Sequence, residues 1–182
     1  YKSTHTFPGP GAYTVYLEDP NRNAEITNIP NSVNVPFYIE SQIIINPFLG
    51  NNSSPVLLNP PIDEACVDAV FQHNPSAFDE DGDSLVFSII EASGLGGESV
   101  PGYTFPEGVS INNQTGTLTW DKPTNQGEYN LAILIQEYRN GFLIGSTIRD
   151  MQVSVKECEN NPPEIKHIEE LCVEAGTVLN FK

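Results

Sequence analysis

The chain has 182 residues, 38% of them hydrophobic, and its 15 Pro and 14 Gly favour short strands joined by turns over helices. Its 8 Lys and Arg against 24 Asp and Glu leave a formal net charge of -16, which would repel phosphate backbones and argues against a nucleic-acid partner. The apolar run at 43–45 is flanked by Gln42 and Asn46, and no apolar window of the sequence approaches the roughly 20 residues that cross a bilayer.

The first predicted strands lie within residues 1–50. A Pro-Gly-Pro-Gly turn at 8–11 leads into a half-buried strand at 11–17, where apolar residues alternate. A second, long strand is expected at 33–45. We interpret these strands as the end of a module.

Six further strand-like runs follow, each bounded by turn-forming residues: 65–72, 84–90, 109–111, 117–120, 129–138 and 148–156. A tight turn is expected at 113–116, and the Asn140-Gly141 pair is favoured in two-residue hairpins. This pattern predicts an all-β sandwich. The only Trp, Trp120, ends one of the runs, and we expect it to pack in the core rather than to stack on a ligand.

Two internal repeats indicate a modular chain. The segment at 127–133 repeats the one at 11–17, 116 positions later, and the segment around Cys172 repeats the one around Cys66, 106 positions later. Such a period fits an immunoglobulin-like sandwich of roughly 100 residues. We therefore predict tandem immunoglobulin/cadherin-like β-sandwich modules: residues 1–50 close one, 51–158 form a complete one, and 159–182 begin another. We expect the chain to be a piece of a longer protein.

Three cysteines leave one without a partner inside the chain. Cys66 lies in the first strand of the complete module and Cys158 follows its last strand, so we expect a disulfide between them. Metal binding is the weaker alternative, because no Cys-x-x-Cys or paired His spacing occurs. Cys172 repeats Cys66, and its partner is expected beyond Lys182. A disulfide indicates an oxidising compartment.

An acidic loop at 79–83 carries the clearest chemical signal. The carboxylates of Asp79, Asp81 and Asp83 alternate along it and could converge on one Ca²⁺, which takes six to eight oxygen ligands. The loop is not an EF-hand, because the position of the distal Glu is Ile90.

Two more carboxylates are candidate ligands of the same ion. Glu137, at the end of a strand, is the better candidate, and Glu64 comes next. The alternative is a solvated acidic turn without metal. We favour calcium, because four acids within five positions repel one another unless a cation neutralises them.

Several of these segments resemble a known family. Residues 77–87, 109–120 and 127–129 resemble the cadherin-like, Ig-like modules of bacterial surface proteins, and residues 7–15 are similar to the closing strands of polycystic-kidney-disease-type (PKD-like) modules. Together with residues 19–23 and 28–33, this combination resembles the gliding-motility-associated, type IX-secreted surface proteins of the Bacteroidetes. The resemblance implies a secreted protein at the bacterial cell surface, whose modules serve as adhesins or stalks.

The expected function is therefore that of a non-enzymatic stalk or adhesin array in cell adhesion or gliding motility. Its expected partners are adjacent modules of the same chain, with surface polysaccharide or secretion-system components as further candidates, and no nucleic acid or membrane span. The alternative is a carbohydrate-binding module, in which Tyr103, Phe105 and Trp120 would form an aromatic platform.

An enzyme is the third and least favoured possibility. His5, His73 and His167 fall in three different predicted modules, so a Ser-His-Asp site is not expected. The carboxylates that could cleave a glycoside lie in or beside a Gly-rich loop: Glu91, Glu98 and Glu107.

Overall fold

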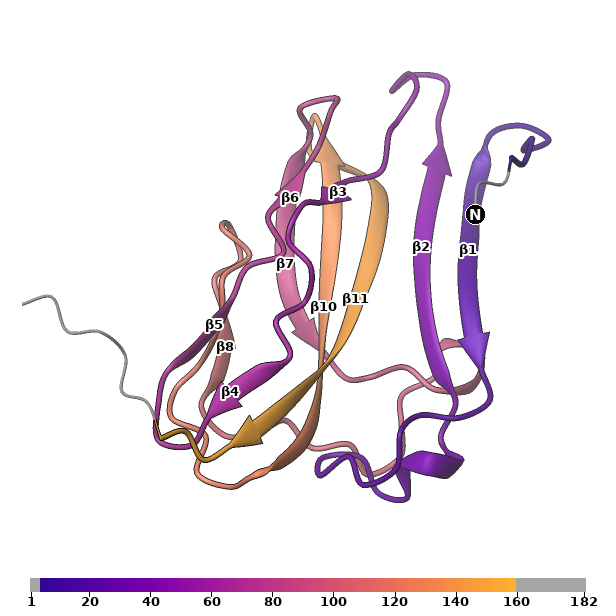
Figure 1. Ribbon diagram of the computed structural model, residues 1–182. Helices are drawn as coiled ribbons and strands as arrows, with labels where there is room; N and C mark the ends of the chain where they lie inside the picture. The colour runs from indigo at the N-terminus through magenta and orange to yellow at the C-terminus, as the bar shows by residue number, and fades with distance from the viewer. Residues whose placement is uncertain (1–3, 160–182) are drawn as a thin grey trace, which may run out of the picture.

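The computed structural model describes residues 4–159, and their regular structure is almost entirely strand (Figure 1). The elements in chain order are β1 (Gly11–Asp19), η1 (Ser32–Asn34), β2 (Phe37–Ile45), β3 (Val56–Leu57), β4 (Glu64–Cys66), β5 (Phe71–His73), β6 (Ala77–Phe78), β7 (Ser84–Ile90), η2 (Leu95–Gly97), β8 (Val109–Ile111), β9 (Leu118–Trp120), β10 (Gly127–Arg139) and β11 (Phe142–Lys156). Within residues 4–159, no helix is long and apolar enough to span a membrane.

The strands form a large sheet and two smaller ones. The large sheet has the order β1-β2-β11-β10-β7, and β4 runs parallel to the end of β11. The small sheets are β5-β9-β8 and β3-β6. Figure 1 shows β5 and β8 to one side of β7, β10 and β11, with β2 and β1 beyond β11 on the other side. The predicted all-β sandwich is confirmed.

The main core lies between the large sheet and the small ones. Alternate residues of β10 face it, as the two-residue period of a strand requires, and they meet side chains of β5, β7, β9 and β11. Trp120 packs here edge-on against Tyr129, and its indole N–H donates to the Glu107 carbonyl oxygen at 3.0 Å. The expectation that Trp120 is a core residue is confirmed.

Two of the predicted strands are shorter in the structure than the sequence indicates. The run at 65–72 is two strands in different sheets, because Asp68 adopts a left-handed φ of 58° and its N–H donates to the Pro123 carbonyl oxygen. The run at 33–45 begins with η1, and only Phe37–Ile45 is strand. The Asn140-Gly141 hairpin forms as predicted, with φ of 52° and 81°, the sign that a type I′ turn needs at both positions.

Residues 4–50 are joined to the rest of the fold through the large sheet and through a second small core. β2 pairs with β11 over three residues, with Ile43 opposite Gly145 and Ser41 opposite Thr147. Ahead of β2, Ile26 and Ile29 pack in a second small core whose other buried members are Ala92, Val100 and Tyr103. Residues 4–50 thus share a sheet and a small core with the predicted complete module, and the module boundary near residue 50 remains a prediction. Cys172 and most of the predicted third module, 159–182, lie outside the described residues.

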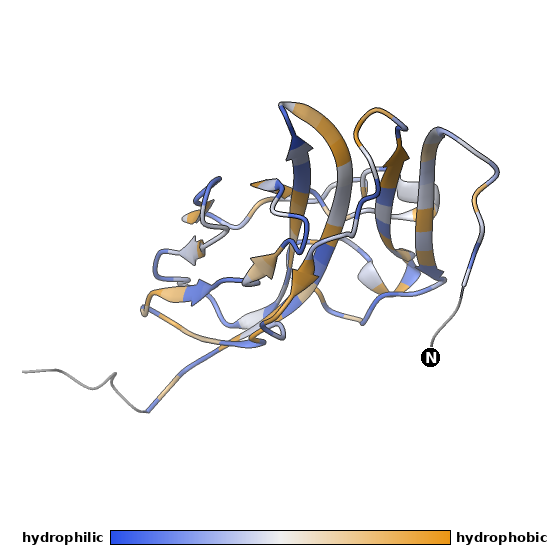
Figure 2. Cartoon of the chain, turned by 90° about the horizontal axis from the view of Figure 1, so that it is seen from above, coloured by the Kyte–Doolittle hydropathy of each residue, from blue (hydrophilic) through white to orange (hydrophobic). Residues whose placement is uncertain are grey.

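The core-facing side of the large sheet continues onto the β1–β2 hairpin. Directly opposed residues share a face, so Val15 lies on the same side as Ser41, Thr147 and the core residue Ile135. Figure 2 shows hydrophobic positions along β1 and β2 as well as on β10 and β11. However, Val15 and Leu17 are 54% and 55% exposed, so within residues 4–159 the second layer does not extend over the hairpin.

Candidate metal centre at the acidic loop

The acidic loop connects β6 to β7. Gly82 adopts a φ of 79°, a left-handed value that suits glycine, and the loop closes when the Asp83 N–H donates to Asp79 Oδ1 at 3.0 Å. As a result, one carboxylate oxygen from each of Asp79, Asp81 and Asp83 lies within 4.8 Å of the others. The structure therefore brings together the three loop carboxylates that the sequence analysis proposed as ligands.

Glu137 lies beside this loop, at the end of the core-facing row of β10. It follows Tyr129, Leu131, Ile133 and Ile135 along that row, and only 1% of it is exposed. Across the hairpin it faces Gly145, where a Cβ atom would collide with the Glu137 carboxylate. A glycine at 145 thus makes room for an acid at a core position.

Only one of the two oxygens of the Glu137 carboxyl group accepts a hydrogen bond from the described residues. Asn52 Nδ2 donates to its Oε2 at 3.0 Å, whereas Oε1 has no hydrogen-bond partner among residues 4–159. The pKa of Glu137 is raised to about 7, chiefly by burial and in addition by the neighbouring Asp79 and Asp83, while the Asn52 hydrogen bond opposes the shift. Glu137 therefore ionises less readily than an ordinary glutamate, and a bound cation would favour its charged form.

Asp79 shows the same deficiency. It is 7% exposed, and its Oδ2 is buried without a hydrogen-bond partner in the described part of the chain. A buried polar atom without a partner costs on the order of 1 to 3 kcal/mol, and more when it is charged. Two adjacent carboxylates that each carry such an oxygen form a site that fits a hard cation.

Arg139 supplies one positive charge to this cluster. Its guanidinium group grips Asp83 at both oxygens, Nε to Oδ1 at 2.8 Å and Nη2 to Oδ2 at 2.6 Å, and it lies 3.4 Å from Asp81 Oδ2. Four ionised carboxylates, on Asp79, Asp81, Asp83 and Glu137, would leave the cluster three charges negative after this pairing. One arginine does not neutralise it.

The segment before β3 closes the cluster from outside. The Ser53 N–H donates to Asp81 Oδ2 at 2.6 Å, and this contact, followed by the Arg139 charge, lowers the pKa of Asp81. Sequence reasoning missed Asn52, Ser53 and Arg139 as members of the site. The repeated Asn-Asn motif at 51–52 and 160–161 was the available signal for Asn52, but it marked only a module start.

Glu64, the second candidate ligand from outside the loop, is not part of the cluster. It is exposed on β4, where its Oε1 pairs with Lys156 Nζ at 2.7 Å and its pKa is lowered by that contact. Figure 1 shows β4 at the opposite end of the fold from β6, which leads into the acidic loop. Glu64 cannot reach an ion bound at that loop.

The disulfide forms between the two cysteines that the repeat comparison paired. Cys66 and Cys158 are bonded, with their Cα atoms 5.5 Å apart. The bond fastens β4 to the chain just beyond β11, next to the three parallel pairs that these strands make. It is compatible with an extracellular protein.

The residues of the two other functional hypotheses are spread over the fold. Tyr103 and Trp120 are buried, and Phe105, which is 50% exposed, packs edge-on against Tyr103. His73 is buried in the core, and His167 lies outside the described residues. Three carboxylates considered for glycoside cleavage are exposed: Glu91, Glu98 and Glu107.

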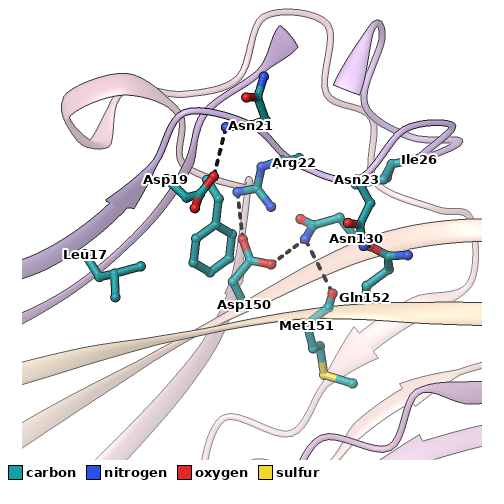
Figure 3. Close-up of a pocket in the computed structure, with 11 residues that line it drawn as sticks. Leu17, Asp19, Asn21, Arg22, Asn23, Ile26, Asn130, Asp150, Met151 and Gln152 are labelled. Carbon is teal, nitrogen blue, oxygen red and sulfur yellow. Dashed lines mark hydrogen bonds and ion pairs between the residues drawn. The ribbon is translucent and has the colours of Figure 1, made fainter. Parts of the chain in front are cut away.

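A cleft of about 380 Å³ opens where β2 and β11 diverge (Figure 3). At its floor Arg22 Nη2 pairs with Asp150 Oδ2 at 2.8 Å, and the guanidinium group lies over the Phe37 ring. Asn130 Nδ2 also donates to Asp150, whose pKa burial raises and these two contacts lower. These polar side chains bind one another, and they thereby connect the loop after β1 to β11.

Comparison with known proteins supports an Ig-like module. Residues 56–142 match the model of the family described as "Putative Ig domain". The matched segment runs from β3 to the start of β11 and contains the acidic loop, Glu137 and Arg139. No curated protein matches the chain. An Ig-like sandwich is typical of cell-surface and adhesion-type modules and is usually not catalytic.

Proposed function

We propose that this chain is a non-catalytic part of a large secreted cell-surface protein, in which Ig-like modules form a stalk or adhesin array for adhesion or gliding motility. The Ig-like match, the disulfide and the all-β architecture support a surface module. Its net charge of -16 suits a partner that is cationic or reached through bound cations.

We further propose that calcium stabilises the module at the acidic loop. The observation that carries this proposal is the pair of buried carboxylate oxygens, Asp79 Oδ2 and Glu137 Oε1, that lack partners among the described residues. Calcium would supply the positive charge that keeps both groups ionised in a buried place. Asp81, and the Asp83 oxygens that Arg139 shares, would complete the carboxylate set.

The neighbouring partners in this proposal are modules of the same polypeptide. Residues 1–50 would be the closing strands of a preceding PKD/Ig-like module. The exposed apolar side of the β1–β2 hairpin supports this assignment, because a sandwich strand buries its alternating apolar face against a second sheet.

Thermal unfolding of the 182-residue chain, with the disulfide intact, tests the calcium proposal. We expect the unfolding temperature to rise by several degrees in excess calcium compared with excess chelator, because a ligand that binds only the folded state stabilises it. Magnesium should produce a smaller rise, since it demands tighter octahedral geometry and dehydrates reluctantly.

Two variants of the loop make this test specific. Asp79→Asn removes one of the buried charges and should abolish most of the calcium-induced rise. Glu80→Gln changes the charge of the same loop by the same amount at an exposed position, and it should retain the rise. An equal response of the wild-type chain and Asp79→Asn would show that the acidic loop is a solvated turn without a metal.

A further inference from the structure

We propose that Arg139 is the protein's own counter-ion to the carboxylates of the acidic loop. It holds the linker at 49–52 in place when calcium is absent, and it weakens calcium binding. This inference rests on the calcium site proposed above and adds the residue that sets its affinity. It also explains how a loop with so many acids can stay assembled without metal.

Arg139 lies at the end of β10, two positions after Glu137. Residues two apart on a strand face the same side, and the pairing of β10 with β7 is regular at Glu137 and Tyr138. An acid and a base on one strand therefore both point to the acidic-loop end of the core. Among residues 4–159, Arg139 is the base that forms ion pairs with the carboxylates of the loop.

The guanidinium group bridges two separate segments. On one side it pairs with both oxygens of Asp83 and approaches Asp81. On the other side Nη1 donates to the carbonyl oxygens of Leu49 at 2.9 Å and Asn51 at 2.8 Å, and Nη2 donates to Asn52 Oδ1 at 3.1 Å. One side chain thus fastens the linker between β2 and β3 to the acidic loop.

The pair between Arg139 and Asp83 is partly shielded from solvent. The side chains are 17% and 4% exposed, so water and salt screen their interaction less than that of a surface pair. The two parallel hydrogen bonds add the strength of a charge-assisted, bidentate contact. Arg139 is therefore held in one position, unlike a freely mobile side chain on the surface.

A metal ion bound to the three Asp carboxylates of the loop and to Glu137 would compete with Arg139 for the same negative field. The two cations repel each other, and each neutralises carboxylates that would otherwise attract the other. Coupling between two such interactions is reciprocal in free energy. If bound calcium reduces the stability that Arg139 contributes, loss of Arg139 must strengthen calcium binding by the same free energy.

The test compares the full chain with Arg139→Gln, in excess chelator and in excess calcium. In chelator we expect Arg139→Gln to unfold at a lower temperature and the amides of 49–52 to exchange hydrogen faster. In calcium the difference should shrink, and calorimetric titration should show calcium binding at least about fivefold tighter in the variant. Arg149→Gln is the matched control, because Arg149 lies on β11 and donates to the Asn59 carbonyl oxygen, away from the acidic loop.

The outcomes separate the two proposals. If wild type binds calcium and Arg139→Gln binds it equally or more weakly, Arg139 is a structural tether only, and the antagonism is overturned while the calcium site stands. If neither protein binds calcium, the calcium site is wrong and this inference falls with it. Equal hydrogen exchange of 49–52 in the two proteins would overturn the tether.

Discussion

At the scale of single residues, the fold depends on a few buried polar groups. The pair of Arg22 and Asp150 is an example, because both side chains are 3% exposed and Arg22 also donates to the Ser93 carbonyl oxygen. Arg22 belongs to the loop after β1, whereas Asp150 belongs to β11 and Ser93 to the loop after β7. The pair therefore joins three segments that are remote in sequence.

Breaking this ion pair should be costly. Arg22→Leu leaves Asp150 buried without its counter-ion, and we expect the free energy of unfolding to fall by about 3 kcal/mol or more. Denaturant unfolding measures this loss. The double variant Arg22→Leu with Asp150→Leu removes the stranded charge and should recover part of it. Equal losses in the single and double variants would contradict the explanation.

His73 should make the protein sensitive to acid. It is 2% exposed, neither ring nitrogen has a hydrogen-bond partner in the described residues, and burial, followed by the charge of Arg149, lowers the pKa of His73. The unfolded chain takes up this proton near pH 6.5 but the folded chain only at lower pH, so stability present above about pH 6.5 is lost as the pH falls. We expect the unfolding free energy of His73→Leu, measured from pH 7 to 5, to fall less steeply than that of wild type; parallel curves would refute this role.

At the scale of elements, two long strands organise the sheet and short strands complete it. β10 and β11 pair over nearly their whole length, and a register shift after Glu137 accompanies the turn into the hairpin. β11 also pairs with β2 at Gly145–Thr147 and with β4 at Ser154–Lys156. The short β4 has only three paired residues to hold it, which explains the value of a disulfide at this place.

Loss of the disulfide should destabilise the fold substantially. The bond closes a loop of 92 positions. Its removal raises the conformational entropy of the unfolded chain, which lowers the free energy of unfolding by roughly 4 to 5 kcal/mol in the chain-entropy model. We expect Cys66→Ser with Cys158→Ser to unfold at a much lower denaturant concentration than wild type. Because the acidic loop lies at the other end of the fold, calcium should still raise the unfolding temperature of this variant. A calcium response lost together with the bond would show that the two ends are coupled.

At the scale of the whole molecule, the large sheet is wider than the layer that covers it. Strands β7, β10 and β11 bury one face in the main core, but within residues 4–159 the same face is half-buried on β2 and exposed on β1 at Val15 and Leu17. The described residues thus combine a packed sandwich with an apolar sheet surface.

This surface should bind apolar dyes. Val15→Thr with Leu17→Thr keeps strand propensity while removing apolar area, so we expect dye fluorescence to fall and the unfolding temperature to change little. Leu58→Thr, at a position that is 61% exposed elsewhere on the fold, is the control and should leave dye binding unchanged. Undiminished dye binding by the hairpin variant would show that its face is covered in solution.

Much of this architecture could be predicted from sequence because strand signals are local. Alternating apolar residues identified β10, turn-forming residues marked the hairpin at Asn140-Gly141, and the repeat of Cys66 by Cys172 pointed to Cys158 as the disulfide partner. The prediction failed at 65–72, where one strand-like run covers two strands. A left-handed turn at Asp68 separates them, and residue patterns alone do not reveal it.

The sequence by itself determined the all-β class, the Ig-like module and the three alternating Asp residues of the loop, since these follow from periodicity, turn chemistry and spacing along the chain. Only the tertiary structure decided that Glu137, Asn52 and Arg139 meet that loop while Glu64 lies at the far end, and that Arg22 and Asp150 form a buried pair. The physical reason is that these contacts join residues up to 128 positions apart, so strand register and sheet order bring them together, and neither can be derived from local pattern.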